Sequence, residues 1–309
     1  MSKKKTVILA LTVMFLWGSL YPSVKFSYKE FGVNGTFFPD LFLFAGLRFL
    51  ISGSIISLFC KAKKTPINIT TKREWAGVFL MGLVAISLHY ACTYVGLSYT
   101  DSSKTALLKQ LGVLFFICFS FLFIKSEKFS ANKLVAALFG VGGIIALNVH
   151  SLQISLGIGE ILIICASVFT VIANVICKKL CEKVNPLWTT GISQIAGGAL
   201  LTSLGLVCGG KLRSISWLGG GIGIYILFAT IVSYSIWYTV VQKNDLSYLF
   251  VLKLSEPLFS AIIGAALLQE NVFTLQYAIA FACVVIAVLI SNIRKNETSD
   301  SSKLLQQER

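Results

Sequence analysis

Four basic residues of this chain lie inside long apolar runs rather than between them: Lys25, Arg48, Lys109 and Lys253. Glu256 is the only acidic residue deep in any such run. A charged side chain in the middle of a membrane costs on the order of 2.5–3.5 kcal/mol, so it tends to face a cavity or a partner. Charges in this setting can bind an oppositely charged molecule or carry a proton. These five residues are therefore the first candidates for function.

The depth of a cation within its run separates anchors from site residues. Lys25 lies in the last turn of the first run, from which its ammonium group can reach the lipid headgroups, and this indicates a structural role. Arg48 lies about nine residues from the nearer end of the second run, close to the midplane, where it needs a cavity or a buried partner.

Two interpretations stay open for Lys109 and Lys253, which each lie about five residues inside a run. Both can flank a central site and attract an anionic group such as a carboxylate. Alternatively, Lys253 pairs with Glu256, three residues further along the same helix, and the two charges cancel. Glu256 is also the one candidate for a proton carrier.

Four further side chains can add polar groups to a site. Trp17 lies about eleven residues, or ~17 Å, into the first run, and Tyr21 follows one turn later on the same face. We expect this face to line a cavity. His89 and Tyr90 can contribute contacts from the third run, although a lone His also fits a hydrogen-bonded packing role. Aromatic residues near the run ends are instead expected in interfacial belts: Tyr94, Tyr99, Trp188, Trp217, Trp237 and Tyr238.

Ten apolar runs would position these side chains, each long enough to cross ~30 Å of hydrocarbon as a helix. Apolar residues make up 56% of the chain and charged residues 13%, whereas ordinary soluble domains have about 25% charged residues. We therefore expect an all-α integral membrane protein with ten transmembrane helices. The runs are 6–28, 39–60, 75–97, 105–124, 132–149, 159–179, 187–208, 217–241, 248–269 and 273–293.

Basic residues between the runs sort to one side of the membrane. Ten spans put both termini on the same side, and 19 of the 27 Lys and Arg residues lie there, against four in the opposite loops. The positive-inside rule then predicts a multi-pass cell-membrane protein with cytoplasmic termini. This placement explains the net charge of +14, so lipid and not nucleic acid is the expected partner. Residues 294–309 have the composition of a disordered cytoplasmic tail.

The spans divide into two similar halves, residues 6–149 and 155–293. Each half has five spans, so a duplicated unit would enter the membrane from opposite faces. An offset of 143 positions aligns Glu127 with Glu270, each after the fourth span of its half, and brings Lys253 within one position of Lys109. We therefore predict two inverted five-helix repeats.

Four motifs carry a resemblance to a known family: WGSLYP (17–22), GLRFL (46–50), YVGLSYTDSSKTALL (94–108) and LSEPLFSAIIGAALLQE (254–270). Together they resemble the EamA-type branch of the drug/metabolite transporter superfamily across both halves. The resemblance implies export of amino acids, metabolites or drugs more often than uptake. That family usually has a Pro about thirteen residues before the Glu; Pro257 matches it, whereas Leu114 stands there in the first half.

The leading hypothesis is a secondary transporter that moves a small organic metabolite, such as an amino acid or carboxylate, by alternating access around a midplane site. The substrate would be anionic or zwitterionic. Its predicted binding residues are Trp17, Tyr21, Arg48, His89, Tyr90, Lys109 and Lys253, and Glu256 is the predicted residue for proton coupling.

A non-transporting membrane receptor or assembly factor is the alternative, although the short outer loops disfavour a large-ligand receptor. An intramembrane enzyme is less favoured still, because it would need a nucleophile with a base, a pair of catalytic Asp or HExxH on a span. The chain has two His, of which His150 lies at an outer span end, and its Asp residues lie near the surfaces, so we predict no catalytic residue. The eight Cys have no metal-ligand or disulfide spacing, so neither a metal nor a cofactor is expected. A homodimer stays open.

Overall fold

The computed structural model describes residues 1–113, 116, 131–148, 157–213, 216–269 and, between 274 and 290, residues 274–276, 278, 279, 282, 283, 286, 287 and 290. Within these residues every regular element is a helix. Seven segments of the described chain are long and apolar enough to cross a membrane: Lys4–Glu30, Phe38–Ala62, Lys72–Tyr99, Ile158–Leu180, Pro186–Val207, Trp217–Lys243 and Leu246–Leu268. The expectation of an all-α, multi-pass membrane protein is confirmed.

These seven segments correspond to seven of the ten predicted runs. The other three, 105–124, 132–149 and 273–293, fall partly outside the described residues. Glu127, Glu270 and the predicted tail 294–309 lie wholly outside them.

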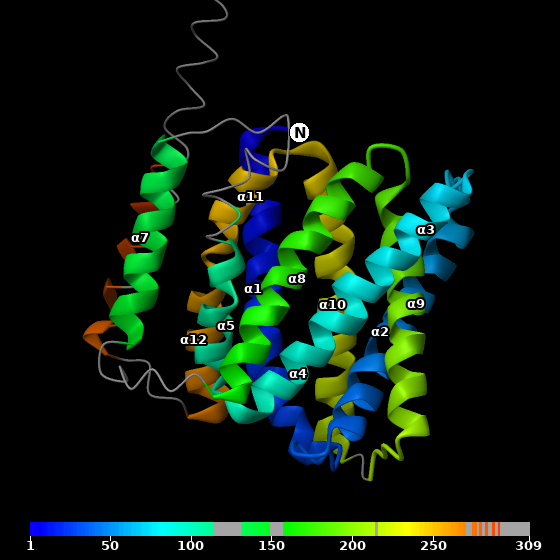
Figure 1. The fold of residues 1–309 in the computed structure, drawn as a ribbon, viewed down its shortest axis with the longest axis horizontal. Helices are drawn as coiled ribbons and strands as arrows, with labels where there is room; N and C mark the ends of the chain where they lie inside the picture. Colours follow the sequence, from blue (N-terminus) through cyan, green and yellow to red (C-terminus); the bar gives the residue numbers. More distant parts are fainter. Residues whose placement is uncertain are drawn as a thin grey trace, which may run out of the picture.

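The long helices lie side by side in one bundle, with α7 (Ala131–Asn148) at its edge (Figure 1). The first turn of helix α1 (Lys3–Glu30) lies beside the last turn of α10 (Trp217–Lys243). The Thr6 hydroxyl of α1 donates to Asn244 Oδ1, just after the end of α10, at 3.0 Å. We call this the N-terminal end of the bundle. At the opposite end Lys25 Nζ donates to the Thr100 carbonyl at 2.6 Å. Lys25 Nζ also lies 3.4 Å from Asp101 Oδ1, so its contacts are within the protein at the end of the bundle, and its structural role stays a prediction.

Helices α2 (Phe38–Ala62) and α9 (Pro186–Val207) pack closely because small residues face each other. Gly46 on α2 meets Gly198 on α9, and Gly53 meets Gly191, with seven-residue spacing on both helices. Gly205 of α9, a further seven residues along, lies against the Leu43 backbone of α2. A Cβ on Gly46 would lie 2.4 Å from the Thr202 backbone nitrogen, a distance at which no side chain fits. The glycines therefore set the separation of the two backbones.

The third span changes its helical geometry just before a predicted site residue. A capping box between Thr71 and Glu74 begins α3 (Lys72–Met81), a π-helical segment η1 (Gly82–Leu88) follows, and α4 (His89–Tyr99) completes the span. In η1 the Ser87 hydroxyl donates to the Gly197 carbonyl of α9 at 3.0 Å. Widened π turns of this kind occur often at functional sites. Here the turn fixes the position at which His89 enters α4.

Two helices are interrupted beside the centre of the bundle. Helix α5 (Ser102–Leu108) ends before Lys109, and helical structure resumes at Gln110. This irregularity is confined to one residue, because the Lys109 N–H still donates to the Thr105 carbonyl at 3.1 Å. Helix α11 (Leu246–Lys253) is separated from α12 (Glu256–Leu268) by Leu254 and Ser255. Pro257 lies in the first turn of α12 and has no N–H for the Lys253 carbonyl, which explains the second interruption.

Candidate functional site

One buried cavity lies between the two halves of the chain, with a volume of about 60 Å³. Its walls come from α1, α2, α4, α8 (Ile158–Leu180), α10 and both interrupted helices. All eight residues predicted for substrate binding and proton coupling line it: Trp17, Tyr21, Arg48, His89, Tyr90, Lys109, Lys253 and Glu256. Residues that are up to 239 positions apart in the sequence therefore meet around one space.

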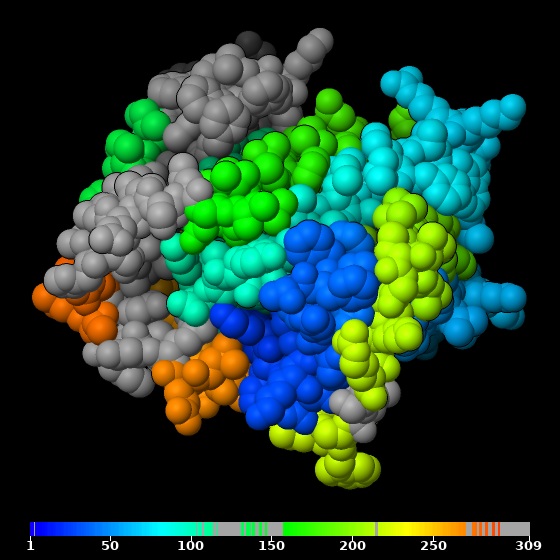
Figure 2. Space-filling view, turned by 60° about the horizontal axis from the view of Figure 1, so that its bottom comes forward, coloured from blue at the N-terminus to red at the C-terminus, as the bar shows by residue number. Residues whose placement is uncertain are grey.

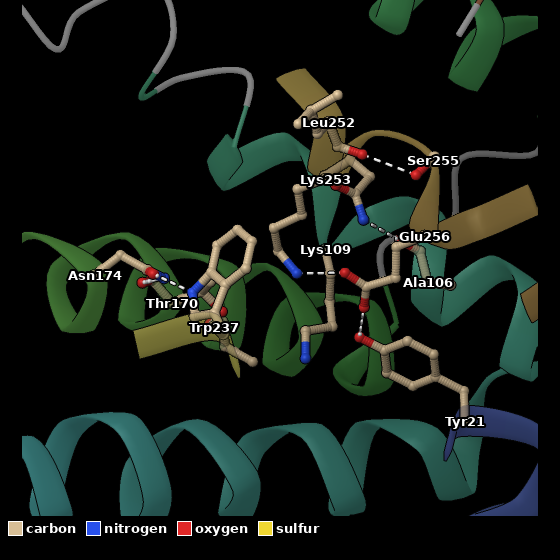
Figure 3. A network of polar contacts seen from close by, with 12 residues as sticks. Tyr21, Ala106, Lys109, Thr170, Asn174, Trp237, Leu252, Lys253, Ser255 and Glu256 are labelled. Atoms are coloured by element: carbon tan, nitrogen blue, oxygen red, sulfur yellow. Dashed lines mark hydrogen bonds and ion pairs between the residues drawn. The ribbon is translucent and has the colours of Figure 1, made fainter. Parts of the chain in front are cut away.

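Glu256 is the acidic residue of the described cavity lining. Its carboxylate forms an ion pair with Lys253 and accepts a hydrogen bond from the Tyr21 hydroxyl at 2.6 Å, as Figure 3 shows. Glu256 is the first residue of α12, where the partial positive charge of the helix N-terminus favours a carboxylate. The Lys253 ammonium also lies 4.5 Å from the centre of the Trp17 ring, a cation–π distance. Of the two interpretations of Lys253, the pair with Glu256 is the contact observed.

Lys109 faces a neutral partner. Its Nζ lies 3.0 Å from His89 Nε2, while His89 Nδ1 lies 3.1 Å from the Ala166 carbonyl oxygen. The Thr170 hydroxyl lies 3.0 Å from the same Nδ1 and donates to the Ala166 carbonyl at 3.1 Å. With its hydrogen on that carbonyl, the hydroxyl accepts from Nδ1, so we assign the ring proton to Nδ1, and Nε2 accepts from the Lys109 ammonium. The imidazole is thus a neutral orienting group, and it does not cancel the charge of Lys109. The Lys109 ammonium also lies 5.1 Å from the Tyr21 ring centre.

Arg48 is 5% exposed and also has neutral partners. Its Nε donates to Thr230 Oγ1 at 2.7 Å, and its Nη1 donates to the Tyr94 hydroxyl at 2.6 Å. The guanidinium carbon lies 4.7 Å from the Phe49 ring centre and 5.5 Å from that of Tyr90. Nη2 has no hydrogen-bond partner among the described residues.

Aromatic rings form the wall between these charged groups. Trp17 packs against Tyr234 and Trp237, with ring centres 5.5 and 5.1 Å away. The Tyr234 hydroxyl lies 2.8 Å from that of Tyr90. Trp237 Nε1 donates to Asn174 Oδ1 at 2.7 Å, which fixes its ring (Figure 3). The wall combines apolar faces with hydroxyl, amide and indole groups, as small-molecule sites commonly do.

The described lining carries three cations and one carboxylate, a formal excess of two positive charges when His89 is neutral. Lys253 is paired with Glu256, so the excess resides on Arg48 and Lys109. Such a cavity attracts an anion and repels a cation.

The belt prediction is wrong for four residues, which are buried. Tyr94, Trp237 and Tyr238 line the cavity and are at most 3% exposed, because polar partners inside the bundle hold them there. Trp188 is also buried, and its Nε1 donates to the Thr65 carbonyl at 3.0 Å. Trp217, by contrast, is 98% exposed at its helix end, as a belt residue should be.

Four polar residues of the lining were not predicted from the sequence: Thr93, Thr170, Asn174 and Tyr234. One signal for them is helical spacing. Thr170 and Asn174 are one turn apart in an otherwise apolar span, and Tyr234 precedes Tyr238 by the same interval. Polar residues repeated on one face of a transmembrane helix indicate a cavity or a partner.

Toward the opposite end of the bundle, further aromatic residues pack beside Tyr94, which lines the cavity. Tyr28 and Phe44 each lie about 6 Å from Tyr94, measured between ring centres, and Phe31 lies 5.2 Å from Phe44. Arg213 forms an ion pair with the buried Asp40 at the same end. Figure 2 shows this end as a close-packed surface of the N-terminal helices with the segments around α4 and α9. A cavity of about 60 Å³ has room for a few water molecules, so a larger molecule needs the helices to move apart.

Known sequences resemble this chain over most of its length. The EamA-like transporter family matches it twice, over residues 4–149 and 157–293. An uncharacterized transporter of Archaeoglobus fulgidus is 26% identical over 277 residues, which are 86% of this chain and 91% of that protein. The uncharacterized transporter YetK of Bacillus subtilis is 23% identical over 83% of this chain and 80% of its own length. A chloroplastic WAT1-related protein of Arabidopsis thaliana is 24% identical over 91% of this chain and 68% of that protein.

A solved crystal structure superposes on the chain with a TM-score of 0.75, over 96% of this chain and 99% of the other. The two sequences are 16% identical, so the likeness concerns the fold alone.

Proposed function

The chain belongs to the EamA-like transporter family, and on this premise we propose that it is a secondary transporter of a small organic metabolite carrying a carboxylate. It works by alternating access around the central cavity, with export as the net direction. Substrate contacts come from Trp17, Tyr21, Arg48, His89, Tyr90, Lys109 and Lys253.

The observation that carries this proposal is the cavity itself. It lies between spans of both halves, and its walls are formed by buried side chains. The described lining has three cationic residues and one anionic residue, which is a formal charge of +2. A structural protein gains nothing from this arrangement, because buried charges without counter-charges cost several kcal/mol each. A transport site gains affinity for an anion from the same charges.

The proposed topology is a duplication of one five-helix unit. We assign residues 6–149 and 155–293 to two inverted five-helix repeats, which together supply ten transmembrane helices. The separate family matches to 4–149 and 157–293 support the duplication. The interruptions at Lys109 and at Leu254–Ser255 also fall within three residues of each other under the 143-residue offset. Interrupted helices at a midplane site are a recurrent feature of transporters with inverted repeats.

The cell membrane is the proposed location, with the N-terminal end of the bundle in the cytoplasm. At that end the described connections contain Lys61, Lys63, Lys64, Lys72, Arg73, Lys183 and Lys243. At the opposite end Lys29, Lys104, Lys211 and Arg213 are the corresponding cations. The larger number of basic residues marks the cytoplasmic side.

Glu256 couples substrate movement to a proton gradient in this proposal. The groups that face its carboxylate are Lys253 and the Tyr21 hydroxyl, and Lys109 lies on the same cavity. A proton on Glu256 would release Lys253 from the pair. Protonation would thereby change both the charge of the cavity and the contact between α11 and α12.

Tracer flux into proteoliposomes tests the function. The purified chain should transport at least one carboxylate or amino acid faster than protein-free liposomes do. Absence of flux for amino acids, carboxylates and amphipathic cations alike would favour a receptor or assembly factor instead.

A further inference from the structure

Two of the cations in the central cavity lack an acidic partner in the part of the chain that the structure describes. Arg48 bonds to the hydroxyls of Thr230 and Tyr94, and Lys109 bonds to the imidazole of His89. Both are at least nine-tenths buried, with exposures of 5% and 4%. Lys253 differs from them because Glu256 neutralises it. The structure therefore holds two separate positive charges that a ligand can neutralise.

Two buried N–H groups on the cavity are also without an acceptor within the described ranges. They are Nη2 of Arg48 and Nε1 of Trp17. A buried donor left without an acceptor costs free energy, and a ligand oxygen removes that cost. Carboxylate oxygens are the acceptors best matched to a guanidinium, because the planar fork can give them two parallel hydrogen bonds.

The two unneutralised cations lie on one aromatic ring. The Arg48 guanidinium carbon is 5.5 Å from the centre of the Tyr90 ring, and Lys109 Nζ is 5.9 Å from it. The two charges are thus at most about 11 Å apart. A short chain with an anionic group at each end can bridge such a separation, with its middle against the Tyr90 ring.

We propose that the cavity selects a short-chain dicarboxylate, with one carboxylate held by Arg48 and the other by Lys109. The inference rests on the proposed transport function, and it narrows the substrate from carboxylates in general to compact dianions. A monocarboxylate neutralises one cation and leaves the other buried without a counter-charge. A dicarboxylate neutralises both, and the pair of Lys253 with Glu256 stays intact.

Binding to the purified full-length chain in detergent tests this inference. Succinate, its monoamide succinamate, butyrate and sulfate are compared by isothermal titration at one ionic strength. Succinate should bind about tenfold or more tightly than succinamate and butyrate, because each of them lacks one charge-assisted contact. Equal affinities for succinate and butyrate overturn the proposal, and so does tighter binding of sulfate than of succinate.

Variants of Arg48 and Lys109 show whether these two cations cause the preference for succinate over butyrate. Arg48→Gln and Lys109→Gln should each bring the affinities for succinate and butyrate within about twofold of each other, because one counter-charge is gone. Lys25→Gln removes a cation outside the cavity and should keep the preference. Arg48→Lys retains the charge without the fork, so succinate binds more weakly while its preference over butyrate persists. A preference that survives both Gln substitutions contradicts the proposal.

Flux measurements separate this inference from the function on which it rests. Preferential binding of succinate without any flux in proteoliposomes contradicts the transport function but supports a dicarboxylate as the ligand. Equal flux of succinate and butyrate supports the transport function but contradicts selection of a dicarboxylate.

Discussion

Lys253 and Glu256 form a buried ion pair across the interruption between α11 and α12. Lys253 is the last residue of one helix, and Glu256 is the first residue of the next. Pro257 removes one α-helical hydrogen bond at this point, and the backbone tightens instead, with Leu254 N–H donating to the Val251 carbonyl at 3.1 Å and Ser255 N–H to the Leu252 carbonyl at 3.2 Å. The ion pair adds a side-chain contact across this tightened turn. The charge balance of the cavity is therefore tied to the geometry of a helix break.

Substitution of either partner of this pair should destabilise the protein. Glu256→Gln or Lys253→Met leaves the other group buried without its partner, and the expected loss is about 3–5 kcal/mol in the free energy of unfolding. The double variant Lys253→Met with Glu256→Gln should recover most of that loss, because no isolated charge remains. Denaturant unfolding in detergent measures the cycle. Additive losses in the double variant would show that the two side chains are not coupled.

Glu256→Gln should also make transport insensitive to a pH gradient. A glutamine cannot bind and release a proton, so an imposed gradient no longer drives accumulation, while downhill flux continues. Uptake into proteoliposomes with and without a pH step measures the effect. Glu160→Gln is the matched control, since Glu160 pairs with Lys104 away from the cavity. Gradient-driven accumulation that is undiminished in Glu256→Gln would contradict the coupling role.

Gly46→Ala should destabilise the bundle by forcing α2 away from α9. The added methyl group would lie 2.4 Å from the Thr202 backbone nitrogen, and overpacking of this kind costs about 1–3 kcal/mol. A lowered thermal midpoint in detergent is the expected result. Gly220→Ala is the control, because nothing described lies within 4 Å of a Cβ there and Ala favours a helix. Equal midpoints for the two variants would show that the close approach is unimportant.

Labelling of single cysteines tests the proposed sidedness. Lys211→Cys at the opposite end of the bundle should react with a membrane-impermeant maleimide in intact cells. Lys64→Cys, at the N-terminal end, should react only after the cells are permeabilised. Both variants are made in a chain whose exposed Cys165 and Cys208 are replaced by Ser. The reverse pattern would invert the topology.

The sequence was sufficient to predict the charged residues on the cavity but not all of their contacts. Charges deep in apolar runs have few stable positions, so Arg48, Lys109 and Glu256 were expected beside a cavity or a partner. Their common location follows from the fold. The pair of Lys253 with Glu256 was one of two alternatives, because their spacing in the sequence does not distinguish a pair from a binding site.

Burial of aromatic residues was harder to predict. Tyr94 and Trp237 lie close enough to their run ends for an interfacial belt, and only tertiary partners decide otherwise. Those partners are Arg48 for Tyr94 and Asn174 for Trp237. Likewise, the first half has Leu114 where the second half has Pro257, so nothing in the sequence indicated a helix interruption at Lys109. Hydropathy identifies the spans, whereas contacts between distant spans decide which faces turn inward.

The role of the cavity cations can be measured as carboxylate flux into proteoliposomes that contain the wild type, Lys109→Gln, Lys253→Gln or Lys25→Gln. We expect saturable flux for the wild type and Lys25→Gln. Lys109→Gln should lose about tenfold or more in apparent affinity, because the Lys109 charge has no acidic partner in the described structure, and Lys253→Gln should lose less, because Glu256 already balances the Lys253 charge. Flux in Lys109→Gln with the same apparent affinity as the wild type would contradict a role for Lys109 in binding the carboxylate.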